Sequence, residues 1–379
     1  MKEDKNLKVT IIGFGNLAES LFYYLEQFIG PENYLSQINA TTADVETIEK
    51  KRNKYGISII LENNVEALKL LQPDIIFFSP PPSVAPRIIQ NELTKYFDFI
   101  RQHNLPLPDI YAFPPVPDAE LYQTLLGKNV QVVTILPNDV REIGSKRLIG
   151  EGVTFCVFPS KWKQESYSRL RRFLSPFGEI YTFKTPEILP ILSTRVLTTA
   201  FAQIVVKTTE IVKKKLEGTQ IKVSHNNIAK TFQNLFLNFK DSKVELDTFE
   251  SSFKLDNITK KSLESIIIAW YSGILEYTRK QNFPHEKADF IVSSMLDLIL
   301  QLSVNVPKEK LNDLLFISAT KGGLLETCLN YIQINIFEHL QDILTVDTIL
   351  EKEQVKSKIY NEVINACNIV LEHGKNLTK

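Results

Sequence analysis

Apolar and polar positions change their spacing at the start of the chain. Four apolar or β-branched residues lie at Val9–Ile12, and Gly13 and Gly15 follow them. The apolar positions then recur at helical spacing at Leu17, Leu21, Phe22 and Leu25. A run of apolar residues predicts a buried strand, and the wider spacing predicts a helix with one apolar face. The first 25 residues therefore predict a strand, a glycine turn and a helix.

The same alternation continues through the first half of the chain. Further runs typical of strands lie at 34–40, 56–61, 73–79, 110–113, 130–136, 153–158 and 178–183. Helical patterns separate several of them, including a short helix at 63–71 and a basic helix containing Arg169, Arg171 and Arg172. Strands that alternate with helices are typical of a mainly parallel sheet covered on both faces. We expect this α/β domain to span residues 1–185.

The second half has few β-type runs and several long helical ones. They lie at 192–216, 228–239, 261–280, 287–302, 324–344 and 351–372. We therefore expect an all-helical domain over residues 186–379, with the boundary at the proline-containing stretch 182–190. A chain of 379 residues also exceeds the usual size of one hydrophobic core, which favours two domains.

The glycine turn is a candidate nucleotide-binding site. Gly13 and Gly15 would allow a tight turn and the close approach of backbone N–H groups to a pyrophosphate, and Ala18 is small enough for helix and strand to pack closely. The helix N-terminus would face the phosphates. Ligands of a doubly wound sheet bind beyond the carboxyl ends of its strands. The candidate cofactor-binding residues are therefore Gly13, Phe14, Gly15, Asn16, Leu17, Ala18, Thr41, Thr42, Ser79, Pro80, Pro81, Pro137 and Asn138.

The end of the second predicted strand bears on the choice of cofactor. An acidic residue there would bind the ribose hydroxyls of NAD and repel the 2′-phosphate of NADP. Thr41 and Thr42 stand at this place, and the basic triplet Lys50–Arg52 follows, which favours NADP. Asp44 and Glu46 are close enough to leave NAD open, and the basic triplet also fits a solvated helix face.

Composition narrows the class of protein. The charges balance at 44 basic and 44 acidic residues, so we expect no nucleic acid as a partner. No uninterrupted apolar run approaches the roughly 20 residues of a membrane span, and we expect no membrane partner. Three separated cysteines and five histidines without HxxxH or HExxH spacing predict neither a disulfide framework nor a metal site. The simplest location is the cytoplasm, and the expected partner is a small molecule.

Several segments resemble the pyrroline-5-carboxylate reductases in order and rough spacing. Ile12–Glu19 resembles the family's GxGNMAE turn, and Leu136–Asn138 its MPN segment. In the second half, Gln281–Ala288 resembles G-L-P-x-E-x-A, and Leu311–Gly323 resembles L-x-D-x-V-x-S-P-G-G. The resemblance implies a Rossmann-type doubly wound parallel sheet, a helical dimerisation domain, a homodimer, and NADPH-dependent reduction of a C=N bond.

Other positions depart from that pattern. The family has a threonine that binds substrate just after its glycine pair, and Leu325 stands at this position here. The S-G-S-G-P-A segment has no convincing match, and one alignment makes residues 190–260 an insertion. Two alternatives therefore stay open: a catalytically silent cofactor-binding dimer that acts as a sensor or scaffold, and a dehydrogenase of a hydroxy or opine-type acid.

The candidate substrate-positioning residues lie in one loop, Thr320, Lys321, Gly322 and Gly323. A glycine pair at a helix start can form an anion-binding nest for the carboxylate of an imine or amino-acid-like substrate, and Lys321 would add charge. The alternative is a plain helix start, in which Thr320 caps the helix and the glycines permit the turn.

Overall fold

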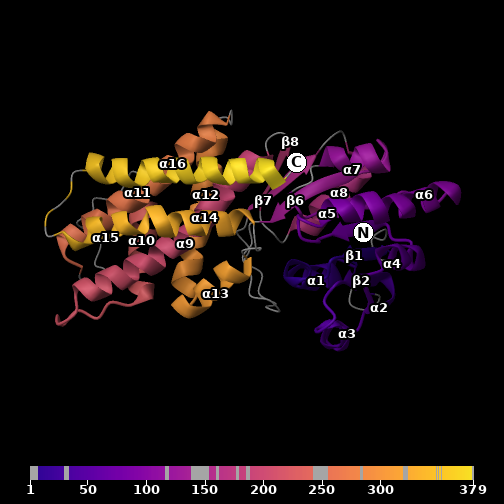
Figure 1. The fold of residues 1–379 in the computed structure, drawn as a ribbon, viewed down its shortest axis with the longest axis horizontal. Helices are drawn as coiled ribbons and strands as arrows, with labels where there is room; N and C mark the ends of the chain where they lie inside the picture. The colour runs from indigo at the N-terminus through magenta and orange to yellow at the C-terminus, as the bar shows by residue number, and fades with distance from the viewer. Residues whose placement is uncertain are drawn as a thin grey trace. The chain divides into compact units, whose positions relative to one another are not determined.

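A computed structural model describes the chain at residues 7–29, 34–115, 119–137, 153–158, 162–175, 179–184, 188–241, 255–281, 285–318, 323–346, 348, 350 and 352–377. The chain divides into two compact units: the first runs to Ile188 and also includes the C-terminal residues from Leu377, and the second is Leu189–Asn376. The first unit contains strands and helices, and the elements of the second unit are helices (Figure 1).

The first unit contains an eight-stranded sheet in the order β3-β2-β1-β4-β5-β6-β7-β8. Its strands are β1 (Val9–Ile12), β2 (Ile38–Thr42), β3 (Ser58–Leu61), β4 (Ile75–Phe78), β5 (Asp109–Ala112), β6 (Val132–Pro137), β7 (Val153–Phe158) and β8 (Glu179–Lys184). Neighbours from β3 to β6 are parallel, whereas β7 runs antiparallel to β6. The prediction of a Rossmann-type, mainly parallel sheet followed by a helical region is confirmed.

Helices cover both faces of this sheet. They are α1 (Asn16–Ile29), α2 (Tyr34–Gln37), α3 (Ile48–Tyr55), α4 (Asn64–Leu71), α5 (Ala85–Ile88), the π-helical turn η2 (Ile89–Leu93), α6 (Thr94–Gln102), α7 (Ala119–Leu126) and α8 (Gln164–Leu174). Side chains of α1, α3 and α8 pack on one face, and side chains of α4 to α7 on the other.

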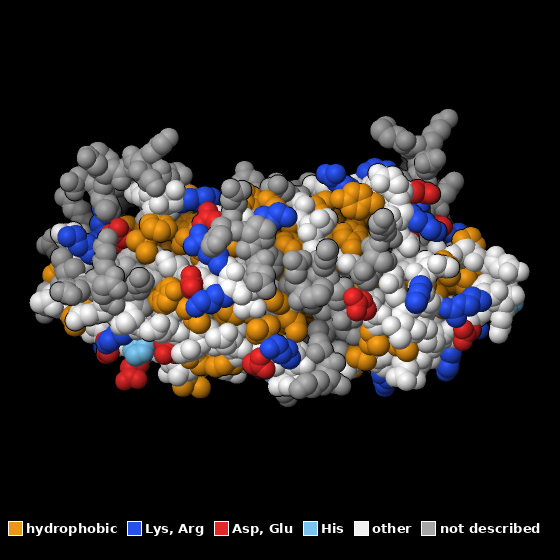
Figure 2. Space-filling view, turned by 90° about the horizontal axis from the view of Figure 1, so that it is seen from above, with side chains coloured by type: hydrophobic (Ala, Val, Ile, Leu, Met, Phe, Trp, Pro, Cys, Tyr) orange, Lys and Arg blue, Asp and Glu red, His pale blue; other side chains and the backbone are white. Residues whose placement is uncertain are grey.

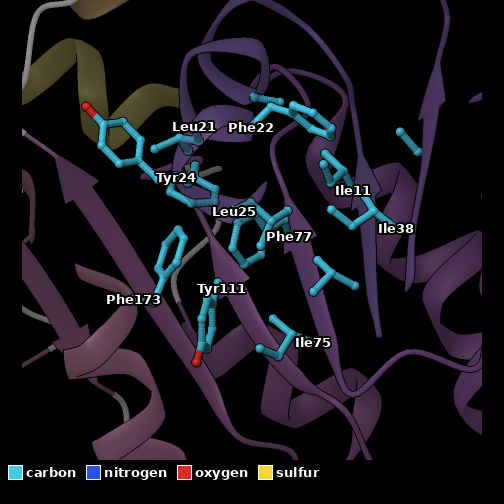
Figure 3. Close-up of a cluster of buried hydrophobic side chains, with 14 of the residues drawn as sticks. Ile11, Leu21, Phe22, Tyr24, Leu25, Ile38, Ile75, Phe77, Tyr111 and Phe173 are labelled. Atoms are coloured by element: carbon cyan, nitrogen blue, oxygen red, sulfur yellow. The ribbon is translucent and has the colours of Figure 1, made fainter. Parts of the chain in front are cut away.

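Strand β4 shows why the sequence folds this way. Ile75 and Phe77 join the core on the α1 side, where Phe77 stacks against Tyr111 and meets Phe173 edge-on (Figure 3). Ile76 and Phe78 join the opposite core. Successive side chains of a strand point to opposite faces, so a continuous apolar run needs cover on both sides.

In the second unit, the regular secondary structure of the described residues is helical. The unit contains α9 (Ile188–Lys215), α10 (His225–Asp241), α11 (Asn257–Lys280), α12 (His285–Asn305), α13 (Lys308–Ser318), α14 (Leu324–Asn335), α15 (Phe337–Thr345) and α16 (Lys352–Leu377). Phe201 of α9 packs edge-on against Phe232 of α10 and Trp270 of α11, all three of them buried.

Some predicted bounds were wrong. The segment predicted as a strand over 34–40 begins as the helical turn α2, and β2 starts only at Ile38 and includes Thr41 and Thr42. The single helix predicted over 324–344 is divided at Ile336 into α14 and α15. Helix α13 was not predicted.

Two helices are long and apolar enough to cross a membrane by length and composition alone, Leu189–Lys215 and Lys287–Asn305. Although neither is an uninterrupted apolar run, both pass this test. Most of each apolar window, 72% and 56%, is buried inside the protein, as in the core helices of soluble proteins, so the finding is weak support for a membrane span. On the face shown in Figure 2, basic and acidic side chains are interspersed.

Candidate functional site

The glycine turn joins β1 to α1 at the centre of the sheet. Strand β1 lies between β2 and β4, which is where the strand order reverses direction. Ligands of doubly wound sheets bind beyond the carboxyl ends of the strands at such a reversal. The turn follows the end of β1 and consists of Gly13, Phe14 and Gly15, and α1 begins at Asn16. The first residues of a helix have N–H groups without intrahelical partners, which favours an anion at this position.

The two glycines of the turn have different surroundings. Gly13 has φ +83°, and a Cβ atom there would lie 2.8 Å from the backbone nitrogen of Pro80. A Cβ atom on Gly15 would meet nothing within 4 Å. Gly13 therefore serves the packing of the turn against the end of β4, whereas Gly15 is exposed and leaves open space in front of α1. Such space beside backbone N–H groups fits a pyrophosphate.

Phe14, between the glycines, points into the core. Its side chain is fully buried and packs edge-on against Phe22 and Tyr55. Its N–H donates to the Thr41 carbonyl at 2.8 Å, which ties the turn to the neighbouring strand β2. Ala18 is buried in the same core, as expected for a small residue between helix and strand. Leu17 is exposed.

The threonines at the end of β2 are both buried and both engaged. The Thr41 hydroxyl donates to Asn64 Oδ1 at 2.5 Å, and Asn64 in turn donates to Glu92 Oε2 at 2.8 Å. The Thr42 hydroxyl accepts from the Asp44 N–H at 3.1 Å. The two threonines therefore shape the strand end through protein contacts, and the residues exposed next to them come from the loop that follows.

The end of β4 supplies the opposite wall of the turn. The Ser79 N–H donates to the Ile12 carbonyl at 2.8 Å, which extends the pairing of β1 and β4 by one residue. Pro80 is buried against Gly13, and Pro81 is exposed. The Pro81 carbonyl accepts from the N–H groups of Val84 and Ala85, each at 3.1 Å, which closes the turn that leads into α5. Ser79, Pro80 and Pro81 thus lie at the carboxyl edge of the sheet beside the glycine turn.

The other predicted site residues are less fully placed. Pro137 ends β6, at the same edge of the sheet but two strands away from β4. Asn138, Thr320, Lys321 and Gly322 lie outside the described residues. Gly323 is the N-cap of α14, with extended backbone at φ −90° and ψ 175°, and its carbonyl accepts from the Thr327 N–H at 3.1 Å. Gly323 therefore occupies the N-cap position of α14.

Sequence reasoning did not identify the contacts that the basic side chains of α3 make within the first unit. Lys51 donates to the Phe14 carbonyl at 3.0 Å and forms ion pairs with Glu19 and Asp44. Arg52 donates to the Ile59 carbonyl at 3.0 Å and contacts Glu49. Two members of the basic triplet therefore donate hydrogen bonds to backbone carbonyls of the protein. The only signal in the sequence was the triplet itself, which does not show what it contacts.

Part of the chain matches a known family. Residues 8–96 match the model of the family described as "NADP oxidoreductase coenzyme F420-dependent". This segment contains the glycine turn, the end of β2 and the end of β4, and the name agrees with the expected NADP. A search of curated proteins finds no match.

A search of solved structures finds similar chains. Pyrroline carboxylate reductase of Plasmodium falciparum, solved with NADP bound, is 12% identical and covers 76% of this chain and 99% of its own, with a TM-score of 0.50. A Streptococcus pyogenes 1-pyrroline-5-carboxylate reductase is 14% identical, covering 80% of this chain and 100% of its own, with a TM-score of 0.45. Prephenate dehydrogenase of A. aeolicus is 15% identical, covering 89% and 93%, with a TM-score of 0.40.

These comparisons bear on the resemblance inferred from the sequence motifs. At such low identities, the likeness to the Plasmodium enzyme shows a common fold. The chain therefore has an NAD(P)-dependent oxidoreductase fold, similar to that of a pyrroline carboxylate reductase.

Proposed function

We propose that this chain is an NADPH-dependent reductase of a C=N bond in a carboxylate-bearing imine. The observation that carries the proposal is the open space at Gly15, in front of the N-terminus of α1 and at the reversal of strand order. The family model over residues 8–96 supports NADP as the cofactor, and the pyrroline carboxylate reductase of Plasmodium falciparum, solved with NADP bound, has a similar fold.

The residues of the first unit would hold the cofactor. The N–H groups of Asn16 and Leu17, at the start of α1, would bind the pyrophosphate, and Gly15 would let it approach the backbone. The ends of β2 and β4 border the turn on its two sides. When bound, the nicotinamide supplies the hydride. The chain contributes orientation, since a cationic imine is electrophilic without a strong protein acid.

The residues of the second unit would position the substrate. We place the substrate carboxylate at the loop Thr320–Gly323, which leads into α14. Gly323 at the N-cap leaves the first N–H groups of this 12-residue helix without a side-chain cap. Such N–H groups, with the helix dipole, favour a carboxylate. Lys321 would add a positive charge.

The position of Leu325 favours a second candidate. It lies in the first turn of α14, partly buried, where the resemblance has a threonine that binds substrate. Replacing a hydroxyl by an isobutyl group removes a hydrogen bond to a polar substrate. A cofactor-binding protein without this activity, or a dehydrogenase of another acid, fits that change.

The assembly is also part of the proposal. We propose a cytoplasmic homodimer formed through the helical unit. Large apolar side chains are exposed on its helices, at Leu237, Phe239, Phe290, Ile334 and Ile369. A dimer interface over these helices would remove such side chains from water. Sedimentation velocity of the purified chain tests this, and a monomer at micromolar concentration rejects it.

One experiment separates the candidate functions. The purified chain is titrated with NADPH and with NADH by calorimetry, and a panel of cyclic imino acids is then assayed by nicotinamide absorbance. Binding followed by turnover supports the reductase. Binding without turnover of any imine rejects it, and oxidation of hydroxy or opine-type acids with NADP then distinguishes a dehydrogenase from a silent protein. Absence of binding rejects the cofactor site itself.

A further inference from the structure

Lys51 holds a buried ammonium group beside the glycine turn. The residue is 9% exposed, although it lies in α3, a helix of charged residues. Its Nζ donates to the Phe14 carbonyl at 3.0 Å, and it lies 3.4 Å from Asp44 Oδ2 and 3.5 Å from Glu19 Oε1. A buried charge is stable only when it is paired and hydrogen-bonded, and here all three partners serve that purpose.

The two carboxylates around Lys51 differ in exposure and in the number of their partners. The Glu19 side chain is 11% exposed, and it also accepts from the Tyr55 hydroxyl at 2.7 Å and pairs with Lys54 at 3.5 Å. The Asp44 side chain is 42% exposed. Glu19 is thus held within the first unit, while Asp44 is the more exposed of the two carboxylates that contact Lys51.

Asp44 is also held in place. It accepts from the Thr47 N–H at 3.1 Å and from the Thr47 hydroxyl, besides its contact with Lys51. These hydrogen bonds close the turn between β2 and α3. The carboxylate therefore occupies a defined position two residues beyond the end of β2.

This position is the corner that receives the adenosine ribose in a dinucleotide-binding sheet, where a carboxylate favours the ribose hydroxyls of NAD and opposes a 2′-phosphate. The link from Asp44 to the glycine turn is short, since Lys51 contacts both Asp44 and the Phe14 carbonyl. The hydroxyls of Thr41 and Thr42 are buried and engaged within the protein. Other charged groups on this loop and helix, Glu46 and Lys50, are exposed.

We propose that the Asp44 carboxylate, held by Lys51, determines how strongly the chain prefers NADPH over NADH. The inference rests on the proposed cofactor site and adds the residue that sets its selectivity. In the native chain the carboxylate repels the 2′-phosphate and occupies one side of the Lys51 ammonium. Without that negative charge the repulsion is removed and the positive charge of Lys51 is less fully balanced, so NADPH gains affinity, while NADH, which has no phosphate there, gains nothing.

The test is the ratio of two dissociation constants in the full-length chain. We expect Asp44→Asn to raise the affinity for NADPH relative to NADH by about tenfold, since one unit charge is removed near a doubly charged phosphate. The variant keeps an oxygen to accept from Thr47. Glu46→Gln, which removes an exposed acid two residues away, is the matched control and should change the ratio by less than about twofold.

The outcomes are distinct. A ratio unchanged in Asp44→Asn overturns the inference, and so does an equal change in Glu46→Gln, because a general field would then act rather than this residue. A native chain that binds neither cofactor rejects the proposed function before the inference is reached. The gain in Asp44→Asn should also shrink at high salt, which screens exposed charges, and a gain that persists unchanged contradicts the electrostatic origin.

Lys51→Met provides a second measurement. Its loss frees the Phe14 carbonyl and leaves Glu19 with a less complete set of partners, so we expect weaker binding of both cofactors. Lys51→Arg keeps the charge and should restore part of the selectivity. If Lys51→Met, with its fold verified by circular dichroism, keeps the native affinity and ratio for both cofactors, Lys51 does not hold the selecting carboxylate and the inference fails.

Discussion

A Cβ atom on Gly13 would lie 2.8 Å from the backbone nitrogen of Pro80, closer than side-chain carbons approach a neighbouring backbone. The contact joins the end of β1 to the end of β4, which are adjacent in the sheet. Since the Ser79 N–H also donates to the Ile12 carbonyl, the two strand ends are fixed against each other. The conformation of the glycine turn therefore depends both on Gly13 itself and on the end of β4 that packs against it.

Gly13→Ala should destabilise the first unit. The new methyl group meets backbone atoms that cannot rotate away, and φ +83° is unfavourable for a residue with a side chain. We expect a loss of about 2–4 kcal/mol in the free energy of unfolding. Urea unfolding measures it, and a loss below about 1 kcal/mol would show that the two strand ends can separate easily.

Gly15→Val should have the opposite profile. A side chain at Gly15 meets open space, so we expect the midpoint of thermal unfolding to change by only about 2 °C. Because it would occupy the space assigned to the pyrophosphate, the affinity for NADPH should fall by about a hundredfold or more. Retained binding, with the fold intact by circular dichroism, would reject the assigned pyrophosphate site.

Tyr55→Phe should make stability depend less on alkaline pH. Burial, and then the bond to Glu19, raises the pKa of Tyr55. A group with a raised folded pKa contributes stability that is full below its unfolded pKa, about 10, and is lost as pH rises above it. We expect the variant to be about 1 kcal/mol less stable at pH 7 and this difference to shrink above pH 10. Urea unfolding across that range measures it, and a constant difference would contradict the assignment.

Asp256→Ala should weaken the start of α11. Asp256 is the N-cap of this helix and accepts from the Thr259 N–H at 2.8 Å and from its hydroxyl at 2.7 Å. Its loss should cost about 1 kcal/mol, whereas Asp256→Asn should retain most of the stability. Thermal unfolding of the two variants compares them directly.

The same cap predicts a pH dependence. Burial alone would raise the pKa of Asp256, but the hydrogen bonds from Thr259 hold it below its usual value. A lowered folded pKa means that the contribution is full above the unfolded pKa and disappears as pH falls through the folded value. The gap between the native chain and Asp256→Asn should therefore narrow in acid. A gap that widens would contradict the sign of the shift.

Gly273→Ala should separate α11 from α16. A Cβ atom there would lie 2.9 Å from Val363 Cγ1 and 3.1 Å from the Tyr360 carbonyl oxygen. We expect a net cost of about 1–3 kcal/mol, although alanine favours the helix. Val363→Ala removes the closest atom, so the double variant should be more stable than the sum of the two losses predicts. Additive losses in this cycle would show that Val363 is not the obstacle.

The sequence predicted the fold where burial alone decides it. The run Ile75–Phe78 is apolar at every position, and it is a strand buried on both faces. Strand β2 was placed too early because residues 34–37 are helical, and its bounds depend on pairing with β1, in which Ile12 faces Thr41. Such pairing is a tertiary property that a local pattern does not contain.

The charged side chains around the turn could not be assigned from the sequence. Lys51 lies 37 residues after Phe14 in the chain, and a run of basic residues looks the same whether it faces solvent or a carbonyl. In the sequence, Glu19 stands out only as the last residue of the glycine-turn motif, yet it contacts Lys51, Lys54 and Tyr55. The sequence indicated where a cofactor site stands, and the structure adds the groups that surround it.

The position of β4 in the middle of the sheet has a consequence for how the protein can be divided. The match to the family model ends at residue 96, inside α6, after β4 and before β5. A fragment cut there would leave β4 as a sheet edge, with the unpaired side of Ile75–Phe78 open to other chains. Exposed apolar edges recruit further strands and aggregate. The segment that matches the family model thus ends before the strand β5 that protects its edge, and a fragment for expression should include β5.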